Sequence, residues 1–335
     1  MPRTVLVTGI TGFIAKRIAR DLLAQGDSVR GTLRNLARAQ EVRDAVADLG
    51  ADALARLDFA PADLTADAGW AEAIAGVDAV IHTASPFPLD IPKDENVLIR
   101  PAVEGTERVL RAAQAAGVTR VVVTSSMEAV MHGTTSNPMT EADWSTPQAK
   151  SAVPYTRSKI LGEKAVWAFG AAHPEMQLTT ILPGMVLGTP TDRHTGSSVG
   201  VIARFLSGKD PMVPDFSLPV VALEDVSAAH VRALDRPESI GNRYILAERF
   251  MGMPDLARLL AATYPDRRIA TRIAPRILIA LLALFDKQLA IAKHLQGLDM
   301  HLSHAAATRD LGLDFISADD AVLRTARFLV DQDAA

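Results

Sequence analysis

The chain has 335 residues, of which 48% are hydrophobic and 22% are charged, so it is long and apolar enough to bury a large core. Its formal net charge of -4 at pH 7 gives no support to a role in binding nucleic acid or an anionic membrane. Cysteine is absent, which excludes disulfides, thiolate metal sites and cysteine nucleophiles, and no other metal site is predicted.

The N-terminus and the longest apolar run bear on membrane association. The first residues carry no basic region followed by an apolar core, so no secretory signal is predicted. The longest apolar run, Ile277 to Phe285, is far shorter than the roughly 20 residues that a membrane-spanning helix needs. We expect a cytoplasmic protein without a membrane span, in which this run forms a buried helix. A lid over an apolar pocket and a weak membrane contact are the alternatives.

An apolar strand near the N-terminus ends at Thr8 and runs directly into two closely spaced glycines. Gly9 permits a sharp turn where a Cβ would clash, and Gly12 permits the backbone to approach a pyrophosphate closely. Ala15 is the small residue needed where the following helix meets the sheet. This helix begins near Gly12 and ends by Gly26, and its N–H groups and positive dipole end suit phosphate. The pattern predicts a dinucleotide-binding turn.

The second strand, Ser28 to Leu33, ends at Arg34. A carboxylate at this place would accept hydrogen bonds from the adenosine ribose of NAD, whereas an arginine pairs with the 2′-phosphate of NADP. Arg38, one turn later, is a candidate second partner of that phosphate. The alternative is that the two arginines form a solvated face. We therefore predict NADP(H) as the cofactor.

Helix and strand patterns alternate through the next hundred residues. The expected helices are Leu36–Leu49, Thr65–Ala75 and Glu95–Ala116, and the expected strands are Leu54–Phe59, Ala79–Ile81 and Arg120–Thr124. Pro101 interrupts the third of these helices, which predicts a kink or a late start. Such alternation predicts an α/β fold, namely a doubly wound parallel sheet of the Rossmann type with helices on both faces.

The loops at the carboxyl ends of the strands are where open parallel sheets bind ligands. Asp63 follows the third strand and suits the exocyclic amine of adenine, or a helix cap, or both together. The loop from His82 to Pro86 is expected to border the cofactor, with His82 itself packed or hydrogen-bonded rather than catalytic. Ser125 and Ser126 stand at the end of the fifth strand.

Tyr155 and Lys159 lie four residues apart in a helical pattern that opens at Pro154, so they share one face of the helix. A nearby ammonium favours phenolate and lowers the pKa of a tyrosine, which makes the pair a candidate for proton transfer. Lys159 also stands four residues before Glu163, and the alternative is a plain surface ion pair between these two.

Taken together, these segments resemble the extended short-chain dehydrogenase/reductase superfamily, or NAD-dependent epimerase/dehydratase family, and within it the dihydroflavonol 4-reductase-like and cinnamoyl-CoA reductase-like branch. The matching segments are Val-Thr-Gly-Ile-Thr-Gly-Phe-Ile-Ala (7–15), Val-Ile-His-Thr-Ala-Ser-Pro (80–86), Pro-Ala-Val-Glu-Gly-Thr (101–106), Arg-Val-Val-Val-Thr-Ser-Ser (120–126), Pro-Tyr-Thr-Arg-Ser-Lys (154–159) and Ile-Leu-Pro-Gly-Met-Val-Leu-Gly (181–188). The resemblance covers about residues 4 to 245, and its motifs are more specific for the superfamily than for the branch.

The resemblance implies a catalytic role for three residues. Tyr155 protonates the carbonyl oxygen as the hydride arrives, and Lys159 holds the nicotinamide ribose and lowers the pKa of Tyr155. Ser126 hydrogen-bonds the substrate oxygen, with Ser125 as the less favoured choice. The expected cofactor contacts lie in the glycine turn and at successive strand ends: Gly9, Thr11, Gly12, Phe13, Ile14, Arg34, Asp63, Leu64, Thr83, Ala84, Ser85, Tyr155, Lys159, Pro183, Gly184 and Val186.

The expected substrate contacts are Ser85, Met127, Met131 and Met185. Plant flavonoid reductases carry an asparagine five residues after the catalytic serine, where this chain has Met131. The methionines indicate an apolar, adaptable pocket and argue against a flavonoid substrate, unless they belong to the core.

We expect residues 1–188 to form the dinucleotide-binding domain, 220–246 to return to the sheet region, and 189–335 to form a smaller, mainly helical substrate lobe. Within the lobe the patterns predict a helix over Val199–Leu206, a strand over Pro219–Leu223, a helix over Val226–Leu234 capped by Asp225, a strand over Arg243–Leu246, and helices from Pro254.

The predicted function is reduction of a small apolar aldehyde or ketone by NADPH, reversible as alcohol oxidation. One alternative is a 3-beta-hydroxysteroid dehydrogenase or nucleotide-sugar epimerase of the same superfamily, the latter with Arg193, Arg204 and Lys209 as candidates for pairing a diphosphate. Another is a regulator that senses NADP without turnover. The resemblance also implies a homodimer formed through helices 95–116 and 155–172.

Overall fold

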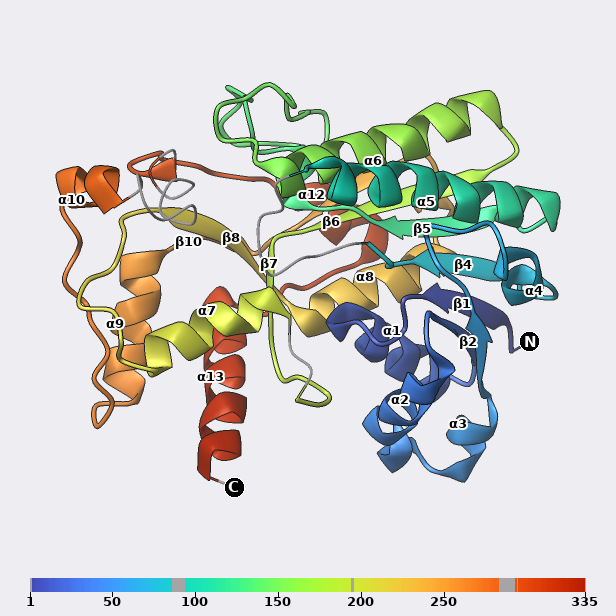
Figure 1. Cartoon of the computed structure of the whole chain (residues 1–335), viewed down its shortest axis with the longest axis horizontal. Coiled ribbons are helices and arrows are strands. Elements are labelled where there is room, and N and C mark those ends of the chain that lie inside the picture. The colour runs from blue at the N-terminus through green and yellow to red at the C-terminus, as the bar shows by residue number, and fades with distance from the viewer. Residues whose placement is uncertain (1, 86–93, 194–195, 283–292, 294, 335) are drawn as a thin grey trace.

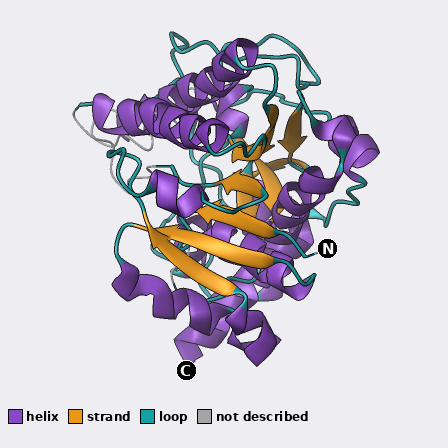
Figure 2. Ribbon diagram, turned by 90° about the vertical axis from the view of Figure 1, so that its right-hand side faces the viewer, coloured by secondary structure: helices purple, strands orange, loops and turns teal. Residues whose placement is uncertain are grey.

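The computed structural model describes residues 2–85, 94–193, 196–282, 293 and 295–334. They form two sheets with helices packed on both faces of the larger one (Figure 1). Figure 2 shows the strands of the larger sheet stacked between helical layers. Within these ranges, no helix combines the length and the apolar character needed to cross a bilayer.

The larger sheet has seven parallel strands in the order β3-β2-β1-β4-β5-β6-β9. Their bounds are β1 Thr4–Thr8, β2 Ser28–Leu33, β3 Leu57–Pro61, β4 Ala79–His82, β5 Arg120–Thr124, β6 Gln177–Pro183 and β9 Arg243–Leu246. The order reverses between β1 and β4, and this reversal is the point at which doubly wound sheets bind their ligands. The expected α/β Rossmann fold is confirmed.

A smaller sheet joins β10 (Arg249–Gly252), β8 (Ser217–Ala222) and β7 (Met185–Leu187), with β8 antiparallel to β10 and parallel to β7. Only Gly184 separates β7 from β6, so one extended segment passes from the large sheet to the small one. The helices are α1 Phe13–Ala24, α2 Ala39–Ala45, α3 Ala51–Ala55, α4 Trp70–Ile74, α5 Asn96–Ala115, α6 Pro154–Ala172, α7 Ser197–Leu206, α8 Leu223–Asp235, α9 Met253–Thr263, α10 Arg276–Leu282, α12 Ala305–Leu311 and α13 Ala318–Ala334.

The strands of the large sheet bury both faces because their side chains alternate. Val5 and Val7 belong to one apolar cluster together with α1 and α8, whereas Leu6 between them packs with α5 in a second cluster. Figure 1 shows α5 and α6 side by side above the sheet and α1 and α8 below it. A third cluster joins α7, α9 and α13 to the small sheet.

Several predicted boundaries were wrong, in each case because a turn overrides the hydrophobic period. Residues 51–55 form α3, so the third strand runs from Leu57 to Pro61 rather than over Leu54–Phe59. The helix expected over 36–49 is divided into α2 and short 3₁₀ turns on either side. The helix expected from Thr65 begins only at Trp70, where Gly69 at φ 87° redirects the chain.

Two expectations in the C-terminal part also change. Asp225 does not cap the helix, because α8 already begins at Leu223; its carboxylate accepts from the N–H of Ile316 instead. Of the run Ile277–Phe285, residues 277–282 lie in α10, where Ile277 and Leu281 are exposed and Ile279 is buried, so this helix is only half covered. Residues 283–285 lie outside the described residues.

Candidate active site and cofactor cleft

A cleft of about 1100 Å³ lies at the carboxyl ends of the strands around the reversal between β1 and β4. This volume lies slightly above the roughly 300–1,000 Å³ usual for ligand sites. All residues predicted to contact the cofactor line it: Gly9, Thr11, Gly12, Phe13, Ile14, Arg34, Asp63, Leu64, Thr83, Ala84, Ser85, Tyr155, Lys159, Pro183, Gly184 and Val186. Ser126 lines it as well.

The glycine turn has the geometry that a pyrophosphate site needs. Gly9 has φ +63°, and a Cβ there would lie 3.0 Å from the backbone of Ala84. Both the backbone conformation and the lack of space therefore disfavour any residue with a side chain. Gly12 caps α1, and its N–H donates to the carbonyl of Gly9 at 2.9 Å. The first N–H groups of α1 have no acceptor within the helix and form the positive end of the helix dipole, so this turn fits a phosphate group.

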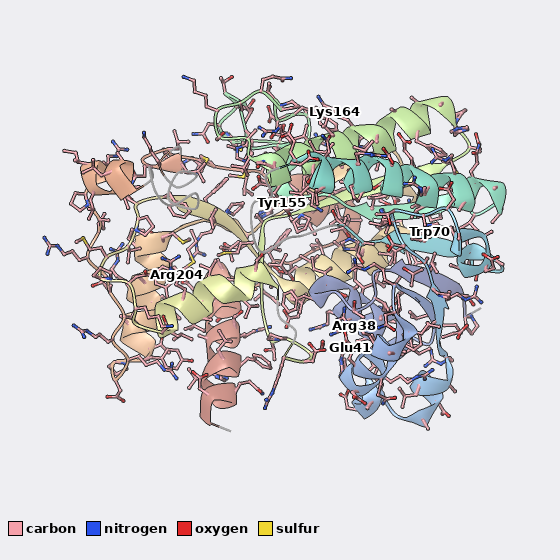
Figure 3. All side chains as sticks on the ribbon, viewed as in Figure 1. Arg38, Glu41, Trp70, Tyr155, Lys164 and Arg204 are labelled. Atoms are coloured by element: carbon pink, nitrogen blue, oxygen red, sulfur yellow. The ribbon has the colours of Figure 1, made fainter. Side chains whose placement is uncertain are left out.

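The end of the cleft beside β2 carries the two predicted arginines. Arg34 is exposed, and within the described residues its guanidinium makes no hydrogen bond or ion pair. Arg38 also lines the cleft, but its guanidinium pairs with Glu41 through contacts of 2.8 and 3.1 Å (Figure 3). Arg34 is therefore the more available cation for a 2′-phosphate.

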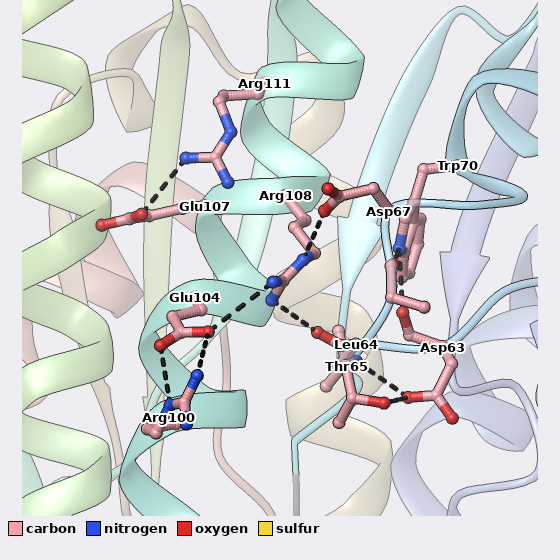
Figure 4. Close-up of polar contacts among 11 residues, drawn as sticks. Asp63, Leu64, Thr65, Asp67, Trp70, Arg100, Glu104, Glu107, Arg108 and Arg111 are labelled. Atoms are coloured by element: carbon pink, nitrogen blue, oxygen red, sulfur yellow. Dashed lines mark hydrogen bonds and ion pairs between the residues drawn. The ribbon is translucent and has the colours of Figure 1, made fainter.

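Asp63 lines the same cleft, close enough to Arg34 for the charge of that guanidinium to act on its carboxylate. One carboxylate oxygen accepts from both the N–H and the hydroxyl of Thr65 at 2.8 Å, and its carbonyl accepts from the indole of Trp70 (Figure 4). The bonds from Thr65, with a smaller contribution from the charge of Arg34, lower the pKa of Asp63. The carboxylate therefore caps a turn rather than a helix.

Ser126 and Tyr155 meet where β5 and α6 approach each other. Tyr155 lies in the first turn of α6, and its phenol is hydrogen-bonded to Ser126, which follows β5. The ammonium of Lys159, one turn along α6, lies 5.8 Å from the centre of the Tyr155 ring. The other candidate serine, Ser125, donates to Glu163 at 2.7 Å. Ser126 is thus the serine that faces Tyr155.

The electrostatics of this pair differ from the sequence prediction. Burial raises the pKa of Tyr155, and the nearby Glu128 carboxylate raises it further, against the hydrogen bond from Ser126. Burial also lowers the pKa of Lys159 to about 8, although Glu128 and Glu163 oppose this. The Tyr155 pKa is therefore raised rather than lowered as expected, because burial and the charge of Glu128 both disfavour the phenolate.

Glu163 does not form a surface ion pair with Lys159. Its side chain is fully buried, and its carboxylate accepts hydrogen bonds from Nε of Arg243 and from the Thr180 hydroxyl, both at 2.8 Å. It also accepts the hydrogen bond from Ser125. The cation comes from β9, which is distant in the sequence, so no local spacing could have indicated it.

His82 is buried, as expected for a packed histidine. Its Nδ1 lies 2.8 Å from the hydroxyl of Thr8 and its Nε2 lies 3.2 Å from that of Thr106. Burial, with a smaller effect of Lys159, lowers the pKa of His82 to about 3, so the ring is neutral at physiological pH.

The three methionines predicted to contact substrate belong to apolar clusters. Met127 and Met131 pack in a cluster with Leu182 and Ile245, and Met185 packs with the small sheet. None of them belongs to the described lining of the cleft, whereas Ser85 does. Their side chains pack in apolar clusters, which agrees with the core alternative, and their contact with substrate stays a prediction.

Sequence reasoning missed two groups of residues at this site. Gly196, Ser197 and Ser198 line the cleft at the start of α7, and a run of small residues before an apolar helix was the available signal. Lys16 in α1 is fully buried and pairs with Asp192 and with Glu41 at 3.4 Å, which ties the segment before α7 to the glycine turn.

Comparison with known proteins agrees with this geometry. A family model described as NAD dependent epimerase/dehydratase family matches residues 5–247. Tetraketide alpha-pyrone reductase 2 of Arabidopsis thaliana is 34% identical over 274 residues, covering 78% of this chain and 83% of the relative. Cinnamoyl-CoA reductase 1 of Petunia hybrida is 34% identical over 275 residues, covering 81% and 80%.

Solved structures show the same similarity over almost the whole chain. Yeast methylglyoxal/isovaleraldehyde reductase Gre2, complexed with NADPH, has a TM-score of 0.82 and 25% sequence identity, covering 99% of each chain. Vestitone reductase from alfalfa has a TM-score of 0.77 and 26% identity, covering 99% of this chain and 100% of the other.

Proposed function

The chain belongs to the NAD dependent epimerase/dehydratase family, and from this premise we propose that it reduces small or medium apolar aldehydes and ketones with NADPH, and oxidises the alcohols in reverse. It is an NADP-dependent oxidoreductase acting on CH–OH or C=O groups, as are its reductase relatives. The observation that carries the proposal is the hydrogen bond between Ser126 and Tyr155, with Lys159 beside it, in the cleft that also holds the glycine turn.

The residues of the cleft suit NADPH, which supplies the hydride when bound. The glycine turn and the start of α1 would hold the pyrophosphate, and Arg34 the 2′-phosphate. Pro183, Gly184 and Val186 would line the nicotinamide end.

At the reacting end, Tyr155 donates its proton to the carbonyl oxygen, and Ser126 hydrogen-bonds the same oxygen. The raised pKa of Tyr155 keeps the phenol protonated at neutral pH, which is the form that a proton donor requires. Lys159 contributes positive charge beside the developing phenolate, and its pKa of about 8 leaves it mostly charged at pH 7.

The lobe built from residues 189–335 is our proposal for the part that selects the substrate. A nucleotide-sugar substrate is less favoured, because Arg204 pairs with Asp210 at 2.6 Å, and Arg193, Arg204 and Lys209 are absent from the described lining of the cleft. A homodimer through α5 and α6 stays a prediction.

The decisive experiment is an NADPH-oxidation screen over aliphatic aldehydes, aryl ketones, ketosteroids and flavonoids, with the Tyr155→Phe variant beside the wild type. We expect the variant to lose roughly 10²- to 10⁴-fold in kcat, the range for removal of a general acid. Tyr264→Phe is the matched control, since Tyr264 lies at the end of α9 outside the described cleft lining. If the Tyr155→Phe variant still oxidised NADPH in a carbonyl-dependent reaction at the wild-type rate, the assignment of Tyr155 as the proton donor would be refuted. Tight NADPH binding without turnover of any carbonyl would favour the regulator.

A further inference from the structure

A carboxylate two residues after Ser126 connects the segments that carry the proposed catalytic pair. Glu128 lies in a short 3₁₀ turn, Met127–Ala129, that Ser126 caps: the N–H of Glu128 donates to the Ser126 hydroxyl oxygen at 3.2 Å. The Ser126 oxygen acts as an acceptor in this bond, so its proton can be donated to another group.

The side chain of Glu128 reaches across to α6. Its carboxylate accepts a hydrogen bond from the hydroxyl of Thr156, the residue next to Tyr155, and Thr156 is fully buried. Glu128 therefore bonds through its backbone to the serine and through its side chain to the neighbour of the tyrosine. A single residue links the end of β5 to the first turn of α6.

His132, four residues after Glu128, holds that carboxylate in place. Nε2 of His132 lies 3.0 Å from Glu128, and Nδ1 lies 2.8 Å from the hydroxyl of Ser151, while the His132 N–H donates to Ser145 at 2.8 Å. The His132 side chain is 3% exposed and that of Glu128 is 26% exposed, so the pair is largely shielded from water. Although burial opposes ionisation, the bonds from His132 and Thr156 lower the pKa of Glu128, and the carboxylate is charged at neutral pH.

We propose that Glu128 is a positioning residue for the reductase reaction: it holds Ser126 at the end of β5 and Thr156, the neighbour of Tyr155, in one hydrogen-bonded arrangement and places a negative charge beside the pair. This inference rests on the proposed function. Among the described residues, the titratable and charged groups around the pair are Glu128 and His132 from the segment after β5, Lys159 and Glu163 from α6, His82 from β4, and Arg243 from β9, which pairs with Glu163. Of these, Glu128 acts on both Tyr155 and Lys159, and it raises the pKa of each.

The sign of the effect follows from that arrangement. Reduction needs a protonated phenol and a charged ammonium, and both forms are lost as the pH rises. Removing the charge of Glu128 lowers both pKa values, so activity is lost at a lower pH. In the oxidation direction Tyr155 accepts the proton and must be deprotonated. The part of the pH profile of kcat in which oxidation rises with deprotonation of Tyr155 therefore also moves to lower pH. A residue with a purely structural role would scale kcat equally at every pH.

The test compares pH profiles of kcat for reduction and oxidation in the wild type, Glu128→Gln and Glu128→Asp. In Glu128→Gln we expect the pH at which reduction is lost, and the pH at which oxidation rises, to decrease by about 1 pH unit, as for loss of a nearby charge. In Glu128→Asp we expect both values to return toward those of the wild type. Glu141→Gln is the matched control, because Glu141 is a partly buried carboxylate that accepts from the N–H of Ile245 and lies outside the described cleft lining. Unshifted values in Glu128→Gln overturn the inference.

A second readout separates this inference from the proposed function. The chain has three tyrosines, so ultraviolet titration of tyrosinate in the wild type, Glu128→Gln and Tyr155→Phe assigns the Tyr155 signal without any turnover. We expect that signal at lower pH in Glu128→Gln than in the wild type. If no carbonyl is reduced, the proposed function fails while this titration still decides the role of Glu128; superimposable curves overturn that role.

Discussion

Arg34 is the residue on which cofactor choice should depend, and its replacement by alanine is a direct test. The guanidinium is exposed at the end of β2 and has no hydrogen bond or ion pair within the described residues, so a 2′-phosphate need not displace a partner. Arg38 is already held by Glu41 at 2.8 Å and cannot fully substitute. A hydrogen bond to a charged group is worth about 1.5–3 kcal/mol, which corresponds to roughly a 10- to 150-fold weaker binding of NADPH.

The assay is titration of NADPH and NADH into the wild type and the variant, followed by nucleotide fluorescence. We expect Arg34→Ala to weaken NADPH by this factor and to leave NADH within about twofold, because NADH lacks the phosphate. Arg43→Ala is a matched control: Arg43 lies in α2, stacks over Phe59 with 5.1 Å to the ring centre, and is not in the described cleft lining. An unchanged ratio of the two affinities, or a wild type that prefers NADH, would refute the reasoning.

Two further predictions concern stability. Arg243→Met leaves Glu163 buried without its cation, which costs about 3–5 kcal/mol of the free energy of unfolding. At an unfolding entropy near 0.7 kcal/mol/K for a chain of this length, Tm should fall by about 4–7 °C. Calorimetry measures this fall, a decrease of less than about 2 °C contradicts the prediction, and adding Glu163→Gln should restore part of the lost stability. The pKa of His82 is lowered to about 3, so the unfolded chain binds the extra proton and stability falls as pH decreases from about 6.5 toward 3, by at most about 1.4 kcal/mol per unit. Urea unfolding at pH 7 and pH 5 should show a smaller difference in stability in His82→Gln than in the wild type. His230, whose pKa is lowered to about 4, contributes in the same direction as His82, and Asp225, whose pKa is raised to about 6, in the opposite one. An unchanged difference in His82→Gln counts against the argument.

The sequence predicted those features of the fold that depend only on residues close together in the chain. The glycine turn was predicted because backbone freedom at Gly9 and the small side chain at Ala15 are properties of single residues. The strand Arg120–Thr124 was predicted because a strand covered on both faces needs an unbroken apolar run. The parallel order of the sheet followed from the alternation of strands and helices.

The sequence by itself determined the fold class and the part of the cleft lining that lies in the glycine turn and at the strand ends, because spacing along a strand or a helix places neighbouring side chains directly. It did not indicate the lining at the start of α7. Only the tertiary structure decided the electrostatics and the partners. It brings Arg243 to Glu163 and Glu128 to Thr156, and it shows burial raising rather than lowering the pKa of Tyr155. These effects depend on distances between segments far apart in the chain and on the exclusion of water, and neither quantity is encoded in local periodicity.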